Sequence, residues 1–338
     1  MAAIQLVKKN PTYQNIPPFD IDILLAHALK KPKEFLYAHP EYKLNIIERL
    51  RLAYFLFLYK RGYSVAAITH HKEFYGLDFY VNRHTLIPRP ETEVMVDEVV
   101  ETTTSQPTCL VDVGTGSGCI AIAIAKQLTC HPEQSEGSSS NQLDPSVASL
   151  PQNDSLKIYA TDISRPALRV AKKNARIQNV SINFLHGNLL EPFLSLRGVR
   201  NERRSNPLTF QINLANVTGT PARGLLRSAR NDMVIITANL PYLTPEQFAT
   251  EPSIQREPRS ALVAGKDGLA LYEKLLQQIK SLLLIVNCSL LIFLEIDPSQ
   301  TSRTTSLIKQ YLPQSSIEIK TDLAGRDRIV KIVYSSIS

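Results

Sequence analysis

One stretch of the chain, from Leu110 to Leu128, joins an apolar run to a glycine-rich turn and then to an apolar helix. The turn carries Gly114, Gly116 and Gly118 at the spacing G-x-G-x-G. A strand that turns through glycines into a helix directs backbone N–H groups and the helix N-terminus at a ligand, as nucleotide-binding units do. The dinucleotide fingerprint has another spacing, G-x-G-x-x-G, and either pattern alone is weak. The stretch predicts an α/β fold that binds its ligand at the carboxyl edge of a parallel sheet.

A second strand is expected at Lys157 to Thr161 and ends at Asp162, whose carboxylate can accept both hydroxyls of a ribose. Ser164 is a typical helix N-cap, with Pro166 in the first turn. The helix that follows is expected to run to about Asn179.

The distance from Gly118 to Asp162 is 44 residues, whereas the usual spacing is roughly 20. Between them, residues His131 to Ser155 contain seven serines and no Lys or Arg. Such a composition cannot bury enough apolar surface to fold. Removing these 25 residues restores an ordinary spacing of 19, so we interpret them as an insertion into a surface loop.

The tetrapeptide Asn239-Leu240-Pro241-Tyr242 follows a short apolar run, Met233 to Ile236. An apolar run that stops before Pro is typical of a buried parallel strand ending at the ligand-binding edge. The Asn oxygen and the next backbone carbonyl can each accept an N–H, while the Tyr ring packs against a flat group. This suits methylation of a planar NH2 nitrogen. Without its context, the motif is equally typical of a strand followed by a Pro turn.

The first 75 residues have helical spacing of their apolar side chains and no glycine before Gly62. Three runs show the spacing: Ile21 to Leu29, Leu44 to Tyr59 and Val65 to Ile68. We expect a bundle of four or five helices, serving either as a stability cap or as a docking platform for a macromolecular substrate.

Between this region and the glycine turn, Phe74 to Val81 alternates around a glycine and predicts a hairpin connector. Ile87 to Pro90 then leads into a helix from Glu91 to Val100.

A second insertion is expected at residues 196–231, which are rich in Arg, Asn, Ser, Thr and Gly. Seven Arg and one Glu fall between Arg197 and Asn231, so much of the formal net charge of +7 comes from this segment. The basic balance is therefore a poor argument for nucleic-acid binding, and we expect none that is stable. A solvated insertion is favoured over an arm that touches ribosomal RNA.

Cysteine usage and hydropathy favour a cytoplasmic protein. The four cysteines (Cys109, Cys119, Cys130 and Cys288) lack metal or redox spacing and are expected to be reduced. Met1 leads into polar sequence rather than a signal peptide, and the longest apolar stretch, Leu282 to Ile296, is too short for a membrane span. The histidines are scattered, so no metal site is proposed.

Several motifs in order resemble the release factor glutamine methyltransferases (the HemK/PrmC family). They are the segments 86–93, 112–118, 160–164, 239–242, 257–262, 265–269 and 324–328. Each motif is widely shared, but their number and order make chance resemblance very improbable. The match runs from about Phe19 to the C-terminus, apart from the two insertions.

The resemblance implies a helical bundle at 1–75 that docks the release factor, a linker at 76–90 and a methyltransferase domain at 91–338. That domain is expected to be a seven-stranded, Rossmann-like class I fold that binds S-adenosylmethionine. The implied reaction is N5-methylation of the glutamine in the Gly-Gly-Gln motif of class 1 peptide chain release factors, which supports translation termination. We expect a monomer.

The resemblance also assigns the site. Gly114, Thr115, Gly116, Ser117 and Gly118 are expected at the methionine end of the cofactor, Asp162 at its ribose, and Asn188 and Leu189 beside its adenine. Asn239, Leu240, Pro241 and Tyr242 are expected to hold the substrate amide, with Asn239 also bordering the cofactor. For Thr92 and Glu93 we favour helix capping over contact with the cofactor. Arg326 and Asp327 are expected to form an ion pair near a hairpin, and contact of Glu295 with the site is the less favoured alternative.

The sequence departs from the family pattern at three places. Leu240 replaces the usual Pro, at a position where the backbone carbonyl is expected to accept an N–H of the substrate amide. Asn188 replaces the usual Asp and still offers an oxygen to the adenine amino group, without charge assistance. Residues 286–288 replace a Gly-Gly turn.

Two alternatives remain open from the sequence. An rRNA or DNA adenine-N6 methyltransferase can carry the same tetrapeptide, although it would not be expected to share the other motifs. In the second alternative, the insertions leave an inactive protein that only binds release factors.

Overall fold

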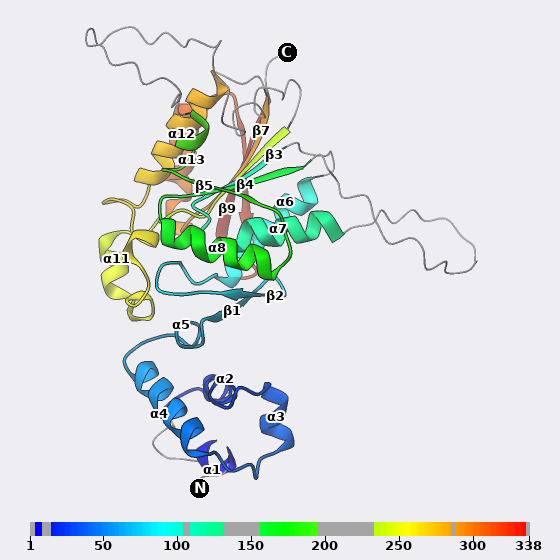
Figure 1. Ribbon diagram of the computed structural model, residues 1–338. Coiled ribbons are helices and arrows are strands. Elements are labelled where there is room, and N and C mark those ends of the chain that lie inside the picture. Colours follow the sequence, from blue (N-terminus) through cyan, green and yellow to red (C-terminus); the bar gives the residue numbers. More distant parts are fainter. Residues whose placement is uncertain are drawn as a thin grey trace, which may run out of the picture.

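The structure is a computed structural model that describes residues 4–8, 15–103, 109–130, 156–194, 233–284 and 288–335. Both predicted insertions, 131–155 and 196–231, lie outside these residues. Figure 1 shows a group of short helices at the N-terminal end, a small hairpin beyond it and then a sheet flanked by helices.

Five helices lie within the described N-terminal residues: α1 (Ile4–Lys8), α2 (Pro18–Leu29), α3 (Lys33–Ala38), α4 (Ile46–Lys60) and α5 (Val65–Thr69). They share an apolar core of their own, centred on Leu24 and Leu25 of α2, both fully buried. A capping box begins α4, where the Asn45 side chain accepts from the Glu48 N–H and the Glu48 carboxylate accepts from the Asn45 N–H.

A hairpin is present but begins before the predicted Phe74, as β1 (His71–Phe74) and β2 (Leu77–Tyr80), which pair antiparallel. Asn174 of α8 (Arg165–Ile177) fixes it to the rest of the molecule. The Asn174 amide accepts from the Tyr80 N–H and donates to the carbonyls of Tyr80 and Ser117. One fully buried side chain thus joins the hairpin to the glycine turn.

The main sheet has seven strands in the order β5-β4-β3-β6-β7-β9-β8. Their bounds are β3 (Cys109–Val113), β4 (Lys157–Asp162), β5 (Asn183–His186), β6 (Met233–Ala238), β7 (Ser289–Glu295), β8 (Ser316–Thr321) and β9 (Asp327–Tyr334). Strands β5, β4, β3, β6 and β7 are parallel, and β9 runs antiparallel to both of its neighbours. The predicted α/β fold with a seven-stranded, mostly parallel sheet is confirmed.

Successive residues of the strands contribute side chains to two apolar cores on opposite faces of the sheet. Val111 and Ile236 point into a core shared with α12 (Ala270–Leu283) and α13 (Thr301–Tyr311). Leu110 and Ile235 point into a core shared with α6 (Glu93–Thr102) and α7 (Cys119–Cys130). Figure 1 shows these two helix pairs on either side of the strands.

Shorter elements complete the described chain: η2 (Pro90–Thr92), α9 (Glu191–Leu194), α11 (Pro245–Thr250), η3 (Pro252–Ile254), η4 (Arg259–Ala261) and η5 (Pro298–Gln300). In the described part of the chain, no helix combines the length and apolar character that crossing a membrane requires.

Local expectations at the helix starts and the cysteines agree with the structure. Ser164 caps α8, since its hydroxyl accepts from the Ala167 N–H. Cys109, Cys119 and Cys288 are free thiols buried in the cores, and burial raises the pKa of the first two to about 12. The predicted helix at Glu91 begins instead as η2 and continues as α6.

Candidate active site

A cavity of about 340 Å³ lies where the carboxyl ends of β3, β4 and β6 meet. Ten of the predicted site residues line it: Gly114, Thr115, Gly116, Ser117, Asp162, Asn188, Leu189, Asn239, Leu240 and Pro241. Gly118 and Tyr242 are not part of this lining. Parts of the chain up to 127 residues apart in sequence therefore converge at one edge of the sheet.

The glycine turn is tied to the next strand. The N–H groups of Gly114 and Thr115 both donate to the Thr161 carbonyl at 2.9 Å. Gly118 packs instead against α8, where a side chain at position 118 would have its Cβ 3.2 Å from the Ala171 Cβ. Gly118 thus allows close packing of α7 against α8, and its predicted contact with the cofactor stays a prediction.

Asp162 at the end of β4 holds the turn from its other side. Its carboxylate accepts from the Gly116 N–H at 2.9 Å and from the Ser164 N–H at 2.7 Å. Each oxygen keeps a further lone pair for a ligand hydroxyl. Burial raises the pKa of this carboxyl above its usual value.

Asp112, on β3, is a buried carboxylate beneath the turn that sequence reasoning gave no role. It accepts from the hydroxyls of Thr115 at 2.6 Å and Thr237 at 2.9 Å, linking the turn to β6. Burial raises the pKa of Asp112 to about 6, and these hydrogen bonds oppose the increase.

The Asn188-Leu189 segment is shaped by Gln278 on α12, which the sequence did not identify. The Gln278 amide accepts from the Leu190 N–H at 2.7 Å and donates to the Asn188 carbonyl at 3.3 Å. Leu189 has a left-handed backbone with a φ of +58°, which costs energy for a residue with a Cβ. The Gln278 contacts on either side of Leu189 hold this strained conformation.

A second cavity of about 270 Å³ also borders the tetrapeptide and is lined by Tyr242, Leu243, Glu251, Ile254 and Glu295 among others. Asn239, Leu240 and Pro241 line both cavities. The tetrapeptide thus stands between two spaces that can hold two different molecules.

The end of the tetrapeptide is held rigidly. The Tyr242 carbonyl accepts from Gln300 Nε2 at 2.8 Å, and its close approach to Gly268 leaves no room there for a side chain. The next residue, Leu243, exchanges backbone hydrogen bonds with Leu262 and Ala264. These contacts explain why the motifs around 262 and 268 accompany the tetrapeptide.

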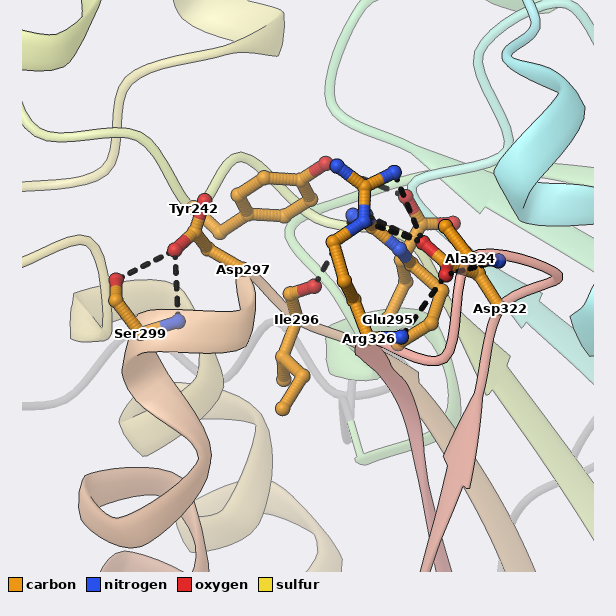
Figure 2. Close-up of polar contacts among 9 residues, drawn as sticks. Tyr242, Glu295, Ile296, Asp297, Ser299, Asp322, Ala324 and Arg326 are labelled. Atoms are coloured by element: carbon orange, nitrogen blue, oxygen red, sulfur yellow. Dashed lines mark hydrogen bonds and ion pairs between the residues drawn. The ribbon is translucent and has the colours of Figure 1, made fainter.

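Glu295 at the end of β7 touches the tetrapeptide directly, against the favoured expectation. Its carboxylate accepts from Asn239 Nδ2 at 2.8 Å and from the Tyr242 hydroxyl at 3.3 Å. Figure 2 shows the Tyr242 ring close to Glu295, with the turn of Asp322, Ala324 and Arg326 beside them. Burial raises the pKa of Glu295 to about 7, and it also raises that of Tyr242.

Two other expectations about side-chain partners were wrong. Thr92 makes no capping hydrogen bond, and its hydroxyl instead accepts from Asn239 Nδ2 at 3.1 Å. Arg326 pairs with Asp322 at 3.2 Å rather than with Asp327, whose carboxylate accepts from the Thr301 hydroxyl.

Glu93 and Glu257 each accept a hydrogen bond from a backbone N–H. Glu93 accepts from the Tyr75 N–H and does not line either cavity. Glu257 binds the Arg89 guanidinium and the Ile87 N–H, so it holds the 87–90 segment, whose Arg89 borders both cavities.

No protein-family model matches the chain. Among curated proteins, it is 26% identical to the release factor glutamine methyltransferase of Bacillus anthracis, over 91% of this chain and 90% of that protein. It is 30% identical to the Enterococcus faecalis protein of the same name, over 76% of this chain and 71% of that protein.

Among solved structures, it is similar to the crystal structure of a release factor-specific protein-(glutamine-N5) methyltransferase from Alicyclobacillus acidocaldarius, at 18% identity and a TM-score of 0.36. That alignment covers 76% of this chain and 99% of the other. The structural likeness is too low to carry the assignment, which rests on the two sequence relatives. By those relatives, the chain belongs to the release factor glutamine methyltransferases.

Proposed function

We propose that the protein methylates the side-chain nitrogen of a release-factor glutamine by holding its amide between Asn239 and the Leu240 carbonyl. The observation that carries the proposal is the position of the tetrapeptide between two cavities. A cofactor in the larger cavity and a glutamine side chain in the smaller one would meet at Asn239. Family membership gives the reaction, methyl transfer from S-adenosylmethionine to the glutamine of a class 1 release factor.

The larger cavity fits S-adenosylmethionine in size and chemistry. Its volume of about 340 Å³ falls in the range of small-molecule sites, roughly 300–1,000 Å³. We assign the backbone of residues 114–117 to the methionine end, Asp162 to the ribose hydroxyls, and Asn188 with Leu189 to the adenine. The raised pKa of Asp162 suits a carboxylate that gains further hydroxyl donors when the ligand binds.

When bound, S-adenosylmethionine supplies an electrophilic methyl group on its sulfonium. The amide nitrogen is a poor nucleophile, so the contribution of the protein is positioning, which can supply on the order of 7–11 kcal/mol in favourable cases. Asn239 Oδ1 and the Leu240 carbonyl each accept one N–H, which turns the nitrogen toward the methyl carbon. Both oxygens also stabilise the positive charge that develops on the nitrogen before it loses a proton. Pro241 and Tyr242 shape the wall against which the planar amide packs.

The N-terminal helices offer a surface for the rest of the release factor. One face of α4 exposes Ile46, Leu50, Tyr54 and Phe57, each more than half accessible to solvent. These residues recur at helical spacing, and an exposed apolar stripe of this kind is typical of an interaction site. We assign residues 1–75 to release-factor docking, 76–90 to a linker and 91–338 to the methyltransferase domain.

We further propose that the protein is cytoplasmic, because release factors act where translation occurs. We also propose that it is a monomer and that it does not bind nucleic acid stably. The adenine-N6 alternative and the inactive alternative are not favoured, since the relatives that match most of the chain are named glutamine methyltransferases.

The test is transfer of labelled methyl groups to a purified class 1 release factor, beside its Gly-Gly-Gln variant with Gln replaced by Ala and beside naked rRNA. Label is expected on the wild-type factor alone and is expected to disappear in Asn239→Ala. Label on rRNA would instead support the adenine alternative. No label on any substrate, with S-adenosylmethionine still bound, would support the inactive alternative.

A further inference from the structure

The amide of Asn239 is held by both of its N–H bonds. Nδ2 donates to Glu295 Oε2 at 2.8 Å and to Thr92 Oγ1 at 3.1 Å. A side-chain amide nitrogen carries two protons, so both are used. Within the described residues, no group donates to Asn239 Oδ1, and Asn239 lines both cavities while only half-buried.

The chemistry of these two partners fixes which end of the amide faces them. An ionised carboxylate only accepts hydrogen bonds, so the Asn239 atom beside Glu295 must be the N–H donor. The oxygen of the Thr92 hydroxyl accepts from Nδ2 at 3.1 Å, and this hydroxyl also lowers the pKa of Glu295. Turning the amide over would set Oδ1 against a carboxylate and break the hydrogen bond to Glu295.

Glu295 also reaches the second proposed acceptor, through its main chain. The Tyr272 hydroxyl donates to the Glu295 carbonyl and accepts from the Leu240 N–H at 3.4 Å. Tyr272 is fully buried on α12. The end of β7 therefore supports the peptide that carries the Leu240 carbonyl as well as the side chain of Asn239.

We propose that Glu295 and Thr92 are positioning residues for methyl transfer, which lock the Asn239 amide with Oδ1 turned toward the substrate glutamine. This rests on the proposed function, because it assumes that Oδ1 accepts the substrate N–H. The pair does not touch the reacting nitrogen. The pair favours the Asn239 orientation in which Oδ1 faces the substrate, so the amide does not have to turn when the substrate binds.

The lock depends on the charge of Glu295. A protonated Glu295 can donate to Asn239 Oδ1 and so permits the reversed amide. The charged and titratable groups around the carboxylate are Arg328 on β9, Glu91 on η2, Tyr242, Tyr272 and Cys119. Burial raises the pKa of Glu295 to about 7, with Arg328 and the bonds from Thr92 and Tyr242 opposing the increase. The locked fraction should fall as the pH falls through 7.

The experiment compares Glu295→Gln, Thr92→Val and Thr92→Ser with the wild type. A matched control is Glu98→Gln, which changes a largely buried carboxylate on α6 that pairs with Lys320 and Lys331 away from the site. The measurements are kcat and KM for the release factor at pH values on either side of 7, the Kd of S-adenosylmethionine and the thermal midpoint.

Wild-type kcat is expected to rise with pH through about 7, and Glu295→Gln should abolish this rise. We expect kcat of Glu295→Gln to be lower by about a hundredfold, as for a misplaced reacting group, with the Kd of the cofactor unchanged. Thr92→Val should lower kcat and Thr92→Ser should restore it, because only the serine keeps the hydroxyl.

A folded Glu295→Gln protein with wild-type kcat and pH profile would overturn the proposal. If Glu295→Gln does not fold, Thr92→Val against Thr92→Ser decides the same question through the other N–H bond. A wild-type protein that labels no release factor would refute the proposed function itself. An active wild type, an inactive Asn239→Ala and fully active Glu295 and Thr92 variants would refute only the positioning role.

Discussion

A methyl group on Gly114 would lie 2.7 Å from Cδ2 of Leu240, so the glycine turn and the tetrapeptide are in direct contact. Gly114 also has a φ of +74°, where side chains are strained. Gly114→Ala is expected to lower the free energy of unfolding by about 1–3 kcal/mol. Urea denaturation measures the change.

The control for this variant is Gly62→Ala. Gly62 has a similar φ of +83° and no neighbouring atom within 4 Å of the added Cβ, so it reports the backbone strain alone. The Gly114 variant should therefore be the more destabilised of the two. Equal losses would show that Leu240 moves aside at no cost.

The cofactor affinity is expected to depend on Asp162. In Asp162→Asn, one of the N–H groups of Gly116 and Ser164 loses its acceptor, because an amide has only one oxygen. The Kd of S-adenosylmethionine, measured by calorimetry, should rise by on the order of tenfold or more. The exposed Asp97→Asn on α6 keeps an oxygen that can accept from the Tyr75 hydroxyl, and it should bind the cofactor as the wild type does. An unchanged Kd in Asp162→Asn would remove this residue from the cofactor site.

Asp112 should make the stability of the protein depend on pH. Its pKa is raised from 3.8 to about 6 in the folded protein, so the folded state binds the proton more tightly. This contribution is fully present below pH 3.8 and is lost as the pH rises through 6. The loss is on the order of 3 kcal/mol.

Chemical denaturation of the wild type and of Asp112→Asn tests this dependence. Other carboxyl groups titrate in the same range, so the informative quantity is the difference between the two proteins. From pH 4 to pH 7, the wild type should lose more stability than Asp112→Asn. Parallel pH profiles would mean that Asp112 does not keep a raised pKa.

The exposed apolar stripe on α4 should contribute to binding of the intact release factor but not to binding of its isolated glutamine loop. Leu50→Gln with Phe57→Gln should raise the KM for the intact factor by about tenfold, as loss of an interface contact does. The KM for a short Gly-Gly-Gln peptide and the value of kcat should stay unchanged. The control is Leu323→Gln, a fully exposed apolar residue on the turn between β8 and β9. If the α4 double variant raised KM equally for the peptide and the intact factor, or no more than Leu323→Gln does, docking on α4 would be contradicted.

Local and periodic signals predicted the strands and turns correctly. The apolar run before Asn239 is a central strand buried on both faces, and such a strand has few alternatives to a parallel sheet. Ser164 acts within its own helix turn, so its role as a cap followed from three neighbouring residues.

Such signals could not predict which residues distant in sequence would become hydrogen-bond partners. Asn239 meets Glu295 across 56 residues and Thr92 across 147, and no periodicity links these positions. Thr92 looked like a cap because it begins a helix, but the tertiary contact with Asn239 determined its hydrogen bond. The bonds from Tyr272 and Gln278 were missed for the same reason, since a polar group on a mostly apolar helix face does not reveal what it will meet.

The order of strands also has a consequence for how the protein withstands heat. Strands β3 and β6 are neighbours in the sheet although 119 residues separate their ends in the chain, and the larger cavity lies across them. A molecule bound there touches both halves of the sheet, and an unfolded chain offers it no comparable site. Saturating cofactor, at a hundred times its Kd, should therefore add about 2.7 kcal/mol to the free energy of unfolding. The melting temperature therefore reports the fraction of protein with cofactor bound, and the measurement requires no substrate.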